Sequence, residues 1–103
     1  MEVEILESAH NDMLEGYWFY ERRQSGLGDY FTDTLYGEMG SLQLYAGIHP
    51  RRMGFLMMLS KVFPYAIYYD VENSVAMVYA VLSTKRDPDW VRTHLRQLQN
   101  LTC

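Results

Sequence analysis

The most constraining feature of this chain is a series of three apolar, β-type segments in its second half, separated by only a few residues. The segments 53–59 (MGFLMML), 63–69 (FPYAIYY) and 75–82 (VAMVYAVL) are rich in β-branched and aromatic residues. The breakers between them, Ser60-Lys61 and residues 72–74, leave no room for a crossover helix. The spacing therefore predicts three consecutive antiparallel strands.

The middle segment lacks the polar alternation that is typical of a half-solvated strand. Because successive side chains of a strand point to opposite faces, its residues divide into two sets. The ring-rich set comprises Phe63, Tyr65, Ile67 and Tyr69, and the opposite set comprises Val62, Ala66 and Tyr68. We expect the ring-rich face to meet helices and the smaller face to accept an apolar partner.

The first half of the chain predicts one strand and a helical hairpin. Residues 2–7 (EVEILE) alternate polar and apolar, which favours a strand. A helix is expected over about 9–24, capped by Ser8, and SGLG at 25–28 ends it. The second helix presents one apolar face made of Leu27, Phe31, Leu35, Met39 and Leu42.

The C-terminal segment predicts one more helix. Asp87 is placed to cap it, Pro88 suits the first helical position, and Val91, Leu95 and Leu98 form an apolar stripe. The element order is then β-α-α-β-β-β-α. This order predicts an α+β fold in one domain over 1–103, with a small antiparallel sheet and the N-terminal hairpin on one of its faces.

Composition narrows the classes of function. A chain of 103 residues with a formal net charge of −4 has no overall attraction for phosphates, which disfavours direct nucleic-acid binding. The one cysteine, Cys103, excludes an internal disulfide, suits a cytoplasmic protein and is a poor candidate nucleophile at the chain end. No signal peptide or membrane-spanning run is expected. The three histidines are scattered, so neither a metal nor a cofactor is expected.

Two short motifs each allow two interpretations. YWFYERR at 17–23 could form a base-stacking platform, but helical spacing favours a core helix whose Tyr17, Trp18 and Tyr20 face the sheet. The pair Lys85-Arg86 could form part of an anion site. Alternatively, Arg86 pairs with a neighbouring aspartate, at position 87 or 89, or is simply solvated.

Four phrases together resemble a known family. They are EGYWFYERRQSGLGDYF (15–31), LYAGIHP (44–50), LSKVFPYAIYYDVE (59–72) and VYAVLSTKRDPDW (78–90). Their order and spacing resemble the RelE/ParE superfamily of toxins from bacterial type II toxin–antitoxin systems, on the ParE-like side. The resemblance implies a RelE/ParE-like fold and a cognate antitoxin as partner. It also implies DNA gyrase as the bound target and a role of the plasmid-stabilisation type.

The chain departs from the RNA-cleaving members of this family. Where RelE-like toxins carry lysines, it has Met57, Met58 and Leu59, and Ala66 follows Tyr65 in place of an arginine. Only Arg86 matches a catalytic cation, and one cation cannot assemble a phosphoryl-transfer site. Whether the chain is an enzyme stays open, and the missing cations favour a protein that acts by binding. The alternatives are a RelE-type ribosome-dependent mRNA endoribonuclease and a non-toxic family member kept as a binding domain.

The expected contact residues lie on the sheet and in the C-terminal region. They are Lys61, Tyr65, Tyr68, Arg86 and Trp90, because tyrosine and tryptophan are common interface anchors. Tyr65 belongs to the ring-rich set, so a core role competes with a contact role for this residue. An exposed apolar sheet face favours a dimer or a complex with a partner over a lone monomer.

Overall fold

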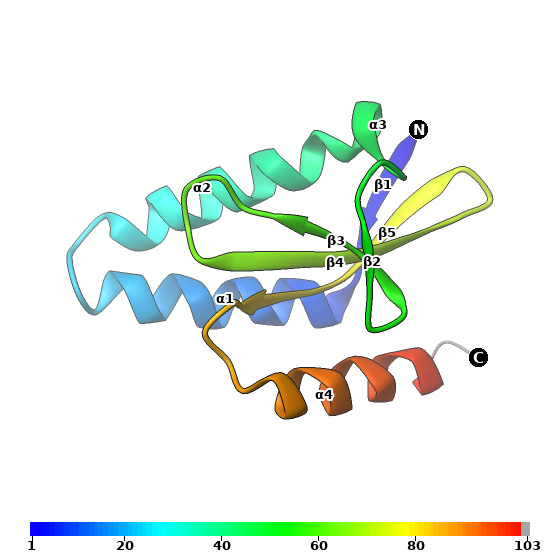
Figure 1. Cartoon of the computed structure of the whole chain (residues 1–103). Helices are drawn as coiled ribbons and strands as arrows, with labels where there is room; N and C mark the ends of the chain where they lie inside the picture. The colour runs from blue at the N-terminus through cyan, green and yellow to red at the C-terminus, as the bar shows by residue number, and fades with distance from the viewer. Residues whose placement is uncertain (102–103) are drawn as a thin grey trace.

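The computed structural model describes residues 1–101, and it contains the predicted elements together with two short additional ones, α3 and β2 (Figure 1). In chain order they are β1 (Glu2–Ile5), α1 (Glu7–Glu21), α2 (Leu27–Gly40), α3 (Leu42–Tyr45), β2 (Arg51–Arg52), β3 (Phe55–Leu59), β4 (Tyr65–Glu72), β5 (Val75–Ser83) and α4 (Pro88–Leu101). The α+β class and the N-terminal helical hairpin are therefore confirmed.

The strands form one five-stranded sheet in the order β1-β5-β4-β3-β2. β2 to β5 are antiparallel neighbours, as the short linkers predict. β1, however, lies parallel to β5, so the expectation of a purely antiparallel sheet is wrong and the sheet is mixed. The helical hairpin after β1 is long enough to act as a crossover connection, and this permits the parallel pairing.

Two tight turns fix the strand ends. Met53 and Gly54 both have positive φ, 55° and 88°, and join β2 to β3. Asn73 and Ser74, with φ of 51° and 63°, join β4 to β5. Two-residue turns of this kind match the twist of antiparallel strands. The first turn cuts the expected strand 53–59 to Phe55–Leu59.

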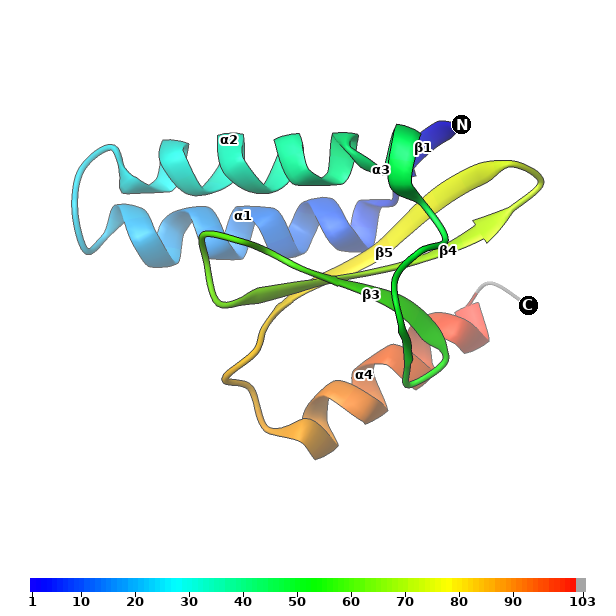
Figure 2. The ribbon, with the colours of Figure 1, turned by 45° about the horizontal axis from the view of Figure 1, so that its top comes forward.

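The molecule has three layers, with α1 and α2 on one face of the sheet and α4 on the other (Figure 2). The ring-rich set of β4 lies on the hairpin side, where Ile67 and Tyr69 are fully buried. Ala66 and Tyr68 lie on the other side, under Val91, Leu95 and Leu98 of α4. The expectation that this second face awaits a partner is therefore wrong, because the apolar stripe of α4 already covers it.

A register shift between Tyr68 and Tyr69 interrupts the pairing of β4 with β5. Tyr79 and Ala80 both belong to the α4-side core, and Val81 returns to the hairpin side. A bulge of this kind bends the strand and changes the direction of its side chains. After the bulge, Val81 faces the hairpin and Leu82 faces α4.

The two helices of the hairpin approach each other at small residues. A Cβ at Gly16 would lie 2.4 Å from the Phe31 ring, and one at Gly28 would lie 2.7 Å from Tyr17. α1 begins at Glu7, two residues before its expected start, and Ser8 does not cap it. At the start of α4, Asp87 does accept a hydrogen bond from the Asp89 N–H at 3.2 Å.

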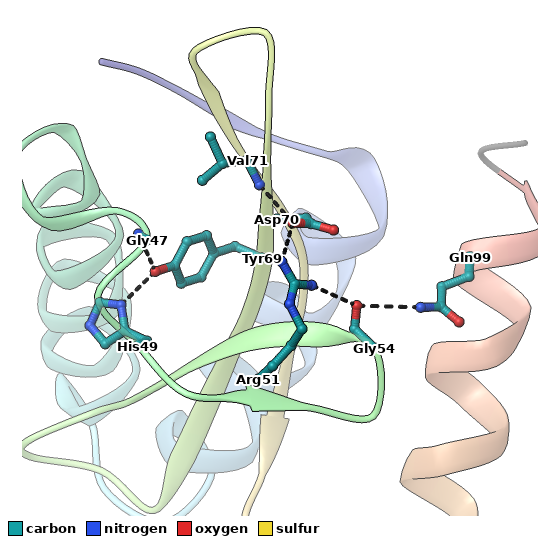
Figure 3. A network of polar contacts seen from close by, with 8 residues as sticks. All are labelled: Gly47, His49, Arg51, Gly54, Tyr69, Asp70, Val71 and Gln99. Atoms are coloured by element: carbon teal, nitrogen blue, oxygen red, sulfur yellow. Dashed lines mark hydrogen bonds and ion pairs between the residues drawn. The ribbon is translucent and has the colours of Figure 1, made fainter.

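A polar network pins the loop before β2 to the sheet (Figure 3). The Tyr69 hydroxyl accepts a hydrogen bond from the Gly47 N–H at 2.9 Å and also contacts Nδ1 of His49. In the tautomer of neutral His49 that carries its proton on Nε2, the Tyr69 hydroxyl donates its one proton to Nδ1 while it accepts from Gly47. Burial lowers the pKa of His49, which favours this neutral form.

Candidate functional site

A cleft of about 580 Å³ lies between α1 and the C-terminal end of β5. We call it the α1–β5 cleft. It is lined by Asp12, Glu15, Gly16, Phe19, Tyr20 and Arg23 of α1, by Pro64 and Tyr65, by Val81, Leu82 and Ser83 of β5, and by Lys85 and Arg86. Titratable side chains from the helix, the sheet and the β5–α4 loop therefore meet in one place.

The cleft exists because β5 is longer than the strand beside it. β1 ends at Ile5, opposite Val78, so the last residues of β5 have no strand on that side. Side chains of α1 replace it there: the Ser8 hydroxyl donates to the Tyr79 carbonyl at 2.7 Å, and Asp12 Oδ2 accepts from the Val81 N–H at 2.9 Å. Such substitutes satisfy an edge that would otherwise be open.

Two carboxyl groups line the cleft, those of Asp12 and Glu15. Burial raises the pKa of Asp12 from its ordinary value of 3.8 to about 7, although the Val81 N–H and Arg86 act in the opposite direction. Burial also raises the pKa of Tyr65 to about 12, so its hydroxyl keeps its proton and can donate a hydrogen bond. The carboxyl of Asp12 is therefore poised between its two charge states near neutral pH.

Three cations also line the cleft: Arg23, Lys85 and Arg86. Among the residues that the structure describes, the ion pairs are Arg51–Asp70 and Arg92–Asp89, so no carboxylate pairs with any of the three. The two arginines are held by rings instead. Arg23 lies 4.3 Å from the centroid of the Phe19 ring, and Arg86 lies 3.8 Å from that of Trp90.

Trp90 extends this support into α4. Its ring stacks on His94 with an interplanar angle of 10° and a centroid distance of 4.7 Å. Burial and the nearby Arg86 lower the pKa of His94, which favours the uncharged ring in the stack. The stack holds Arg86 from one side and leaves its N–H donors in the plane of the guanidinium available.

The predicted contact residues lie in different parts of the structure. Tyr65 and Arg86 line the α1–β5 cleft, and Trp90, which is 38% exposed, supports Arg86. Lys61 lies elsewhere, in the turn before β4, with its backbone N–H donating to Glu38 Oε2 at 2.8 Å. Tyr68 is only 7% exposed and packs under α4, so a partner cannot touch it while that helix is in place.

The structure shows the surroundings of the two motifs that allowed two interpretations, residues 17–23 and Lys85-Arg86. In 17–23, Tyr20 packs on Phe31 and Tyr17 meets Gly28, but Trp18 is 48% exposed and does not face the sheet as expected. Arg86 forms no ion pair with either neighbouring aspartate, and its guanidinium lies over Trp90 instead. Lys85-Arg86 is therefore the sequence signal that pointed to the cleft.

Sequence reasoning missed the acidic residues of the cleft. Asp12 lies in the first turn of the helix expected over about 9–24, and neither it nor Glu15 forms a recognisable motif. Both lie on the side of α1 that meets the end of β5. Ser8 and Asp12 are four residues apart and therefore share one side of a helix, which could have indicated that this side meets backbone groups.

A second surface lies at the opposite edge of the sheet, beside β3. We call it the β3-edge surface. Its pocket, of about 680 Å³, is lined by Thr34, Gly37, Glu38, Ser41, Tyr45, Ile48, His49, Met58, Leu59 and Lys61. Tyr45, Ile48 and Leu59 are 54%, 73% and 55% exposed. β2 pairs with β3 only at Phe55 and Leu56, so the edge of β3 near Leu59 has no strand beside it.

Three further expectations concern a metal site, a membrane span and the cysteine. No group of histidine, cysteine, aspartate or glutamate within residues 1–101 is arranged to hold a metal ion. None of the helices in this range has the length and apolar character that a membrane span requires. Cys103 lies outside the described residues.

The five-stranded mixed sheet, with a helical hairpin on one face and a C-terminal helix on the other, is compatible with the RelE/ParE-like toxin fold. The chain is similar to one from a solved structure described as "Chromosomal ParDE TA system from P. aeruginosa", with a TM-score of 0.74. The two are 14% identical, and the match covers 81% of this chain and 95% of the other. No family model and no curated protein matches this sequence. The fold expected from the four sequence phrases is confirmed.

Proposed function

We propose that this chain is the toxin component of a bacterial type II toxin–antitoxin module. In this role it binds a gyrase-type protein target and is neutralised by a cognate antitoxin in the cytoplasm. The observation that carries the proposal is the shared fold with a chain of a ParDE toxin–antitoxin pair, together with the sequence phrases that resemble ParE-like toxins. Shared fold alone does not fix function, so the surfaces of this chain must support it.

The composition of the sheet favours binding over RNA cleavage. The central strands read FLMML, YAIYYDVE and VAMVYAVLS and contain no lysine or arginine. Met57 and Ala66, which stand at positions of catalytic cations in the cleaving relatives, pack toward α4. Phosphoryl transfer needs cations around the phosphate, and these three strands offer none.

The β3-edge surface supports a protein partner. Exposed Tyr45, Ile48 and Leu59 surround a pocket beside an open strand edge, and Leu44 next to them is 81% exposed. Such an edge can accept an added strand, and its exposed apolar side chains can anchor the added segment. This surface supports a complex with an antitoxin or a second copy of the chain.

The test is expression in bacteria with and without the product of the adjacent reading frame. We expect growth arrest with the chain alone, rescue by the neighbour and co-purification of the two proteins. Inhibition of supercoiling by purified protein then supports a gyrase-type target. The variant Leu59→Ser tests the surface that binds the neighbour. It should weaken the complex without unfolding the chain, because this side chain is exposed.

Three outcomes contradict the proposal in different ways. Messenger RNA cleavage on ribosomes that is lost in Arg86→Gln favours the endoribonuclease alternative. Tight binding of the neighbour without growth arrest favours the non-toxic binding domain. If the experiment shows no growth arrest and no co-purification, a role in a toxin–antitoxin module is refuted.

A further inference from the structure

We infer that the α1–β5 cleft is a docking site for an extended peptide segment that carries carboxylate side chains. The inference rests on the proposed function in one respect: the segment would belong to the antitoxin. Beyond that function, the inference states where on the molecule the segment binds and which chemical groups make the contact. Three features of the cleft carry it, and each is independent of the others.

The first feature is a group of three cations that form no salt bridge. Arg23, Lys85 and Arg86 line one cleft of a chain whose net charge is −4, and none of them is in a salt bridge within residues 1–101, although Asp12 and Glu15 line the same cleft. Arg23 and Arg86 lie over the rings of Phe19 and Trp90, which limits their motion. Preorganised guanidinium groups bind carboxylates through two parallel hydrogen bonds at a reduced entropic cost.

The second feature is an open stretch of strand edge. Residues two apart on a strand direct their backbone groups to the same side, and the Val81 N–H points to Asp12. The Val81 carbonyl and the Ser83 N–H therefore face the cleft, beyond the end of β1 at Ile5. A peptide in extended form can pair with these groups, which a nucleic acid cannot do in this way.

The third feature is the pair of acidic residues in the cleft. Glu15 and Asp12 line it together with the cations, and Glu15 acts on Asp12 strongly enough to raise its pKa further. A continuous phosphate backbone would meet these acids as well as the cations. A peptide can place its carboxylates at Arg23, Lys85 and Arg86 and an uncharged residue beside Asp12. These charges favour a peptide over RNA.

Binding can be measured with the purified full chain and a synthetic probe. The probe is a fluorescein-labelled, end-capped pentapeptide in which valine and glutamate alternate, and the control peptide has glutamine at the glutamate positions. We expect the glutamate peptide to bind at least about tenfold more tightly, because charge-assisted hydrogen bonds are the strong ones. In ¹⁵N spectra the shifts should map to Val81, Ser83 and Arg86.

The protein variants are matched in charge. The triple variant Arg23→Gln, Lys85→Gln, Arg86→Gln removes the cations of the cleft. The control Arg22→Gln, Arg52→Gln, Arg96→Gln removes the same number of exposed cations elsewhere. The first should lose at least about tenfold in affinity for the probe, and the second should change it less than about twofold. Melting temperatures check that both variants fold.

The inference is overturned if both peptides bind equally, if the two triple variants behave alike, or if shifts map to Leu59 and Ile48. It is also overturned if a short oligouridylate displaces the probe, which would assign the cleft to RNA. Peptide binding to purified protein does not require toxicity. The probe can therefore bind when no growth arrest is seen, and growth arrest can persist when the probe fails to bind.

Discussion

The tightest contact between α1 and α2 gives the sharpest test of the fold. Gly16 faces Phe31, and an added Cβ would lie 2.4 and 2.5 Å from two ring carbons. The ring cannot retreat, because Phe31 is fully buried and has the rings of Tyr20, Phe63 and Tyr65 at centroid distances of 5.1, 5.2 and 4.9 Å. Gly16→Ala should therefore force the two helices apart.

The magnitude follows from two opposing effects. Overpacking of a close-packed core costs about 1–3 kcal/mol. Alanine in place of glycine within a helix returns up to about 1 kcal/mol. We expect Gly16→Ala to lose about 1–2 kcal/mol of unfolding free energy, which corresponds to a decrease of about 5–10 °C in melting temperature for a chain of this size.

Gly37→Ala is the matched control. It lies in α2, and a Cβ there meets nothing within 4 Å, so only the gain in helix propensity applies. We expect this variant to be more stable than the wild type by up to about 1 kcal/mol. Thermal and urea unfolding measure both variants. A Gly16→Ala protein at least as stable as the wild type would refute the close approach of the helices.

Two more variants test polar contacts, and a third tests the turn between β2 and β3. In Asp12→Asn the amide still accepts from the Val81 N–H. The folded-state pKa of Asp12 is raised from 3.8 to about 7, so its stabilising contribution is complete below pH 3.8 and is lost as pH rises through about 7. This difference in pKa corresponds to about 4 kcal/mol of unfolding free energy. Because the cleft is open to water, we expect Asp12→Asn to recover about half of that free energy at about pH 8. At about pH 4 it should recover little, and urea unfolding measures both values. Tyr69→Phe leaves the Gly47 N–H and His49 Nδ1 without their partner and should cost about 1–3 kcal/mol by calorimetry; a neutral result would show that water replaces the hydroxyl. Gly54→Ala places a side chain at a φ of +88° and should cost about 1–2 kcal/mol in the same assay, and equal stability would contradict the left-handed turn.

Local patterns were sufficient to predict most of the elements. The apolar face of α2 is buried at Phe31, Leu35 and Met39, as helical spacing requires. The alternation in β4 correctly separated its two faces. The parallel pairing of β1 was not predictable in this way, because alternation identifies a strand but not the strand that it pairs with.

The role of α4 shows a second limit. Its stripe, Val91, Leu95 and Leu98, and the small face of β4 were both visible in the sequence as apolar surfaces without partners. Their pairing depends on the path of residues 84–87, which reverse the chain across the sheet (Figure 2). Loop path is a tertiary property, and no periodicity encodes it.

The candidate site was harder to predict, because its residues come from separate parts of the chain. Only Lys85-Arg86 formed a visible pair, while Asp12 and Arg23 are brought to it by the packing of α1 on β5. Tyr65 and Trp90 were predicted as partner contacts, and the structure places Tyr65 in the lining of the cleft and Trp90 under Arg86 as a support.

Because helices cover both faces of the sheet, a partner can reach the backbone of the strands only where a strand edge is open. β4 lies between β5, which borders the basic cleft, and β3, which borders the apolar β3-edge surface. One partner must therefore wrap around the sheet to reach both, or two partners can bind at once. Salt separates these cases, because exposed charge contacts are screened and apolar contacts are not. A partner that uses both edges should lose affinity in high salt in the wild type but not in the triple cleft variant, while Leu59→Ser weakens it at every salt concentration.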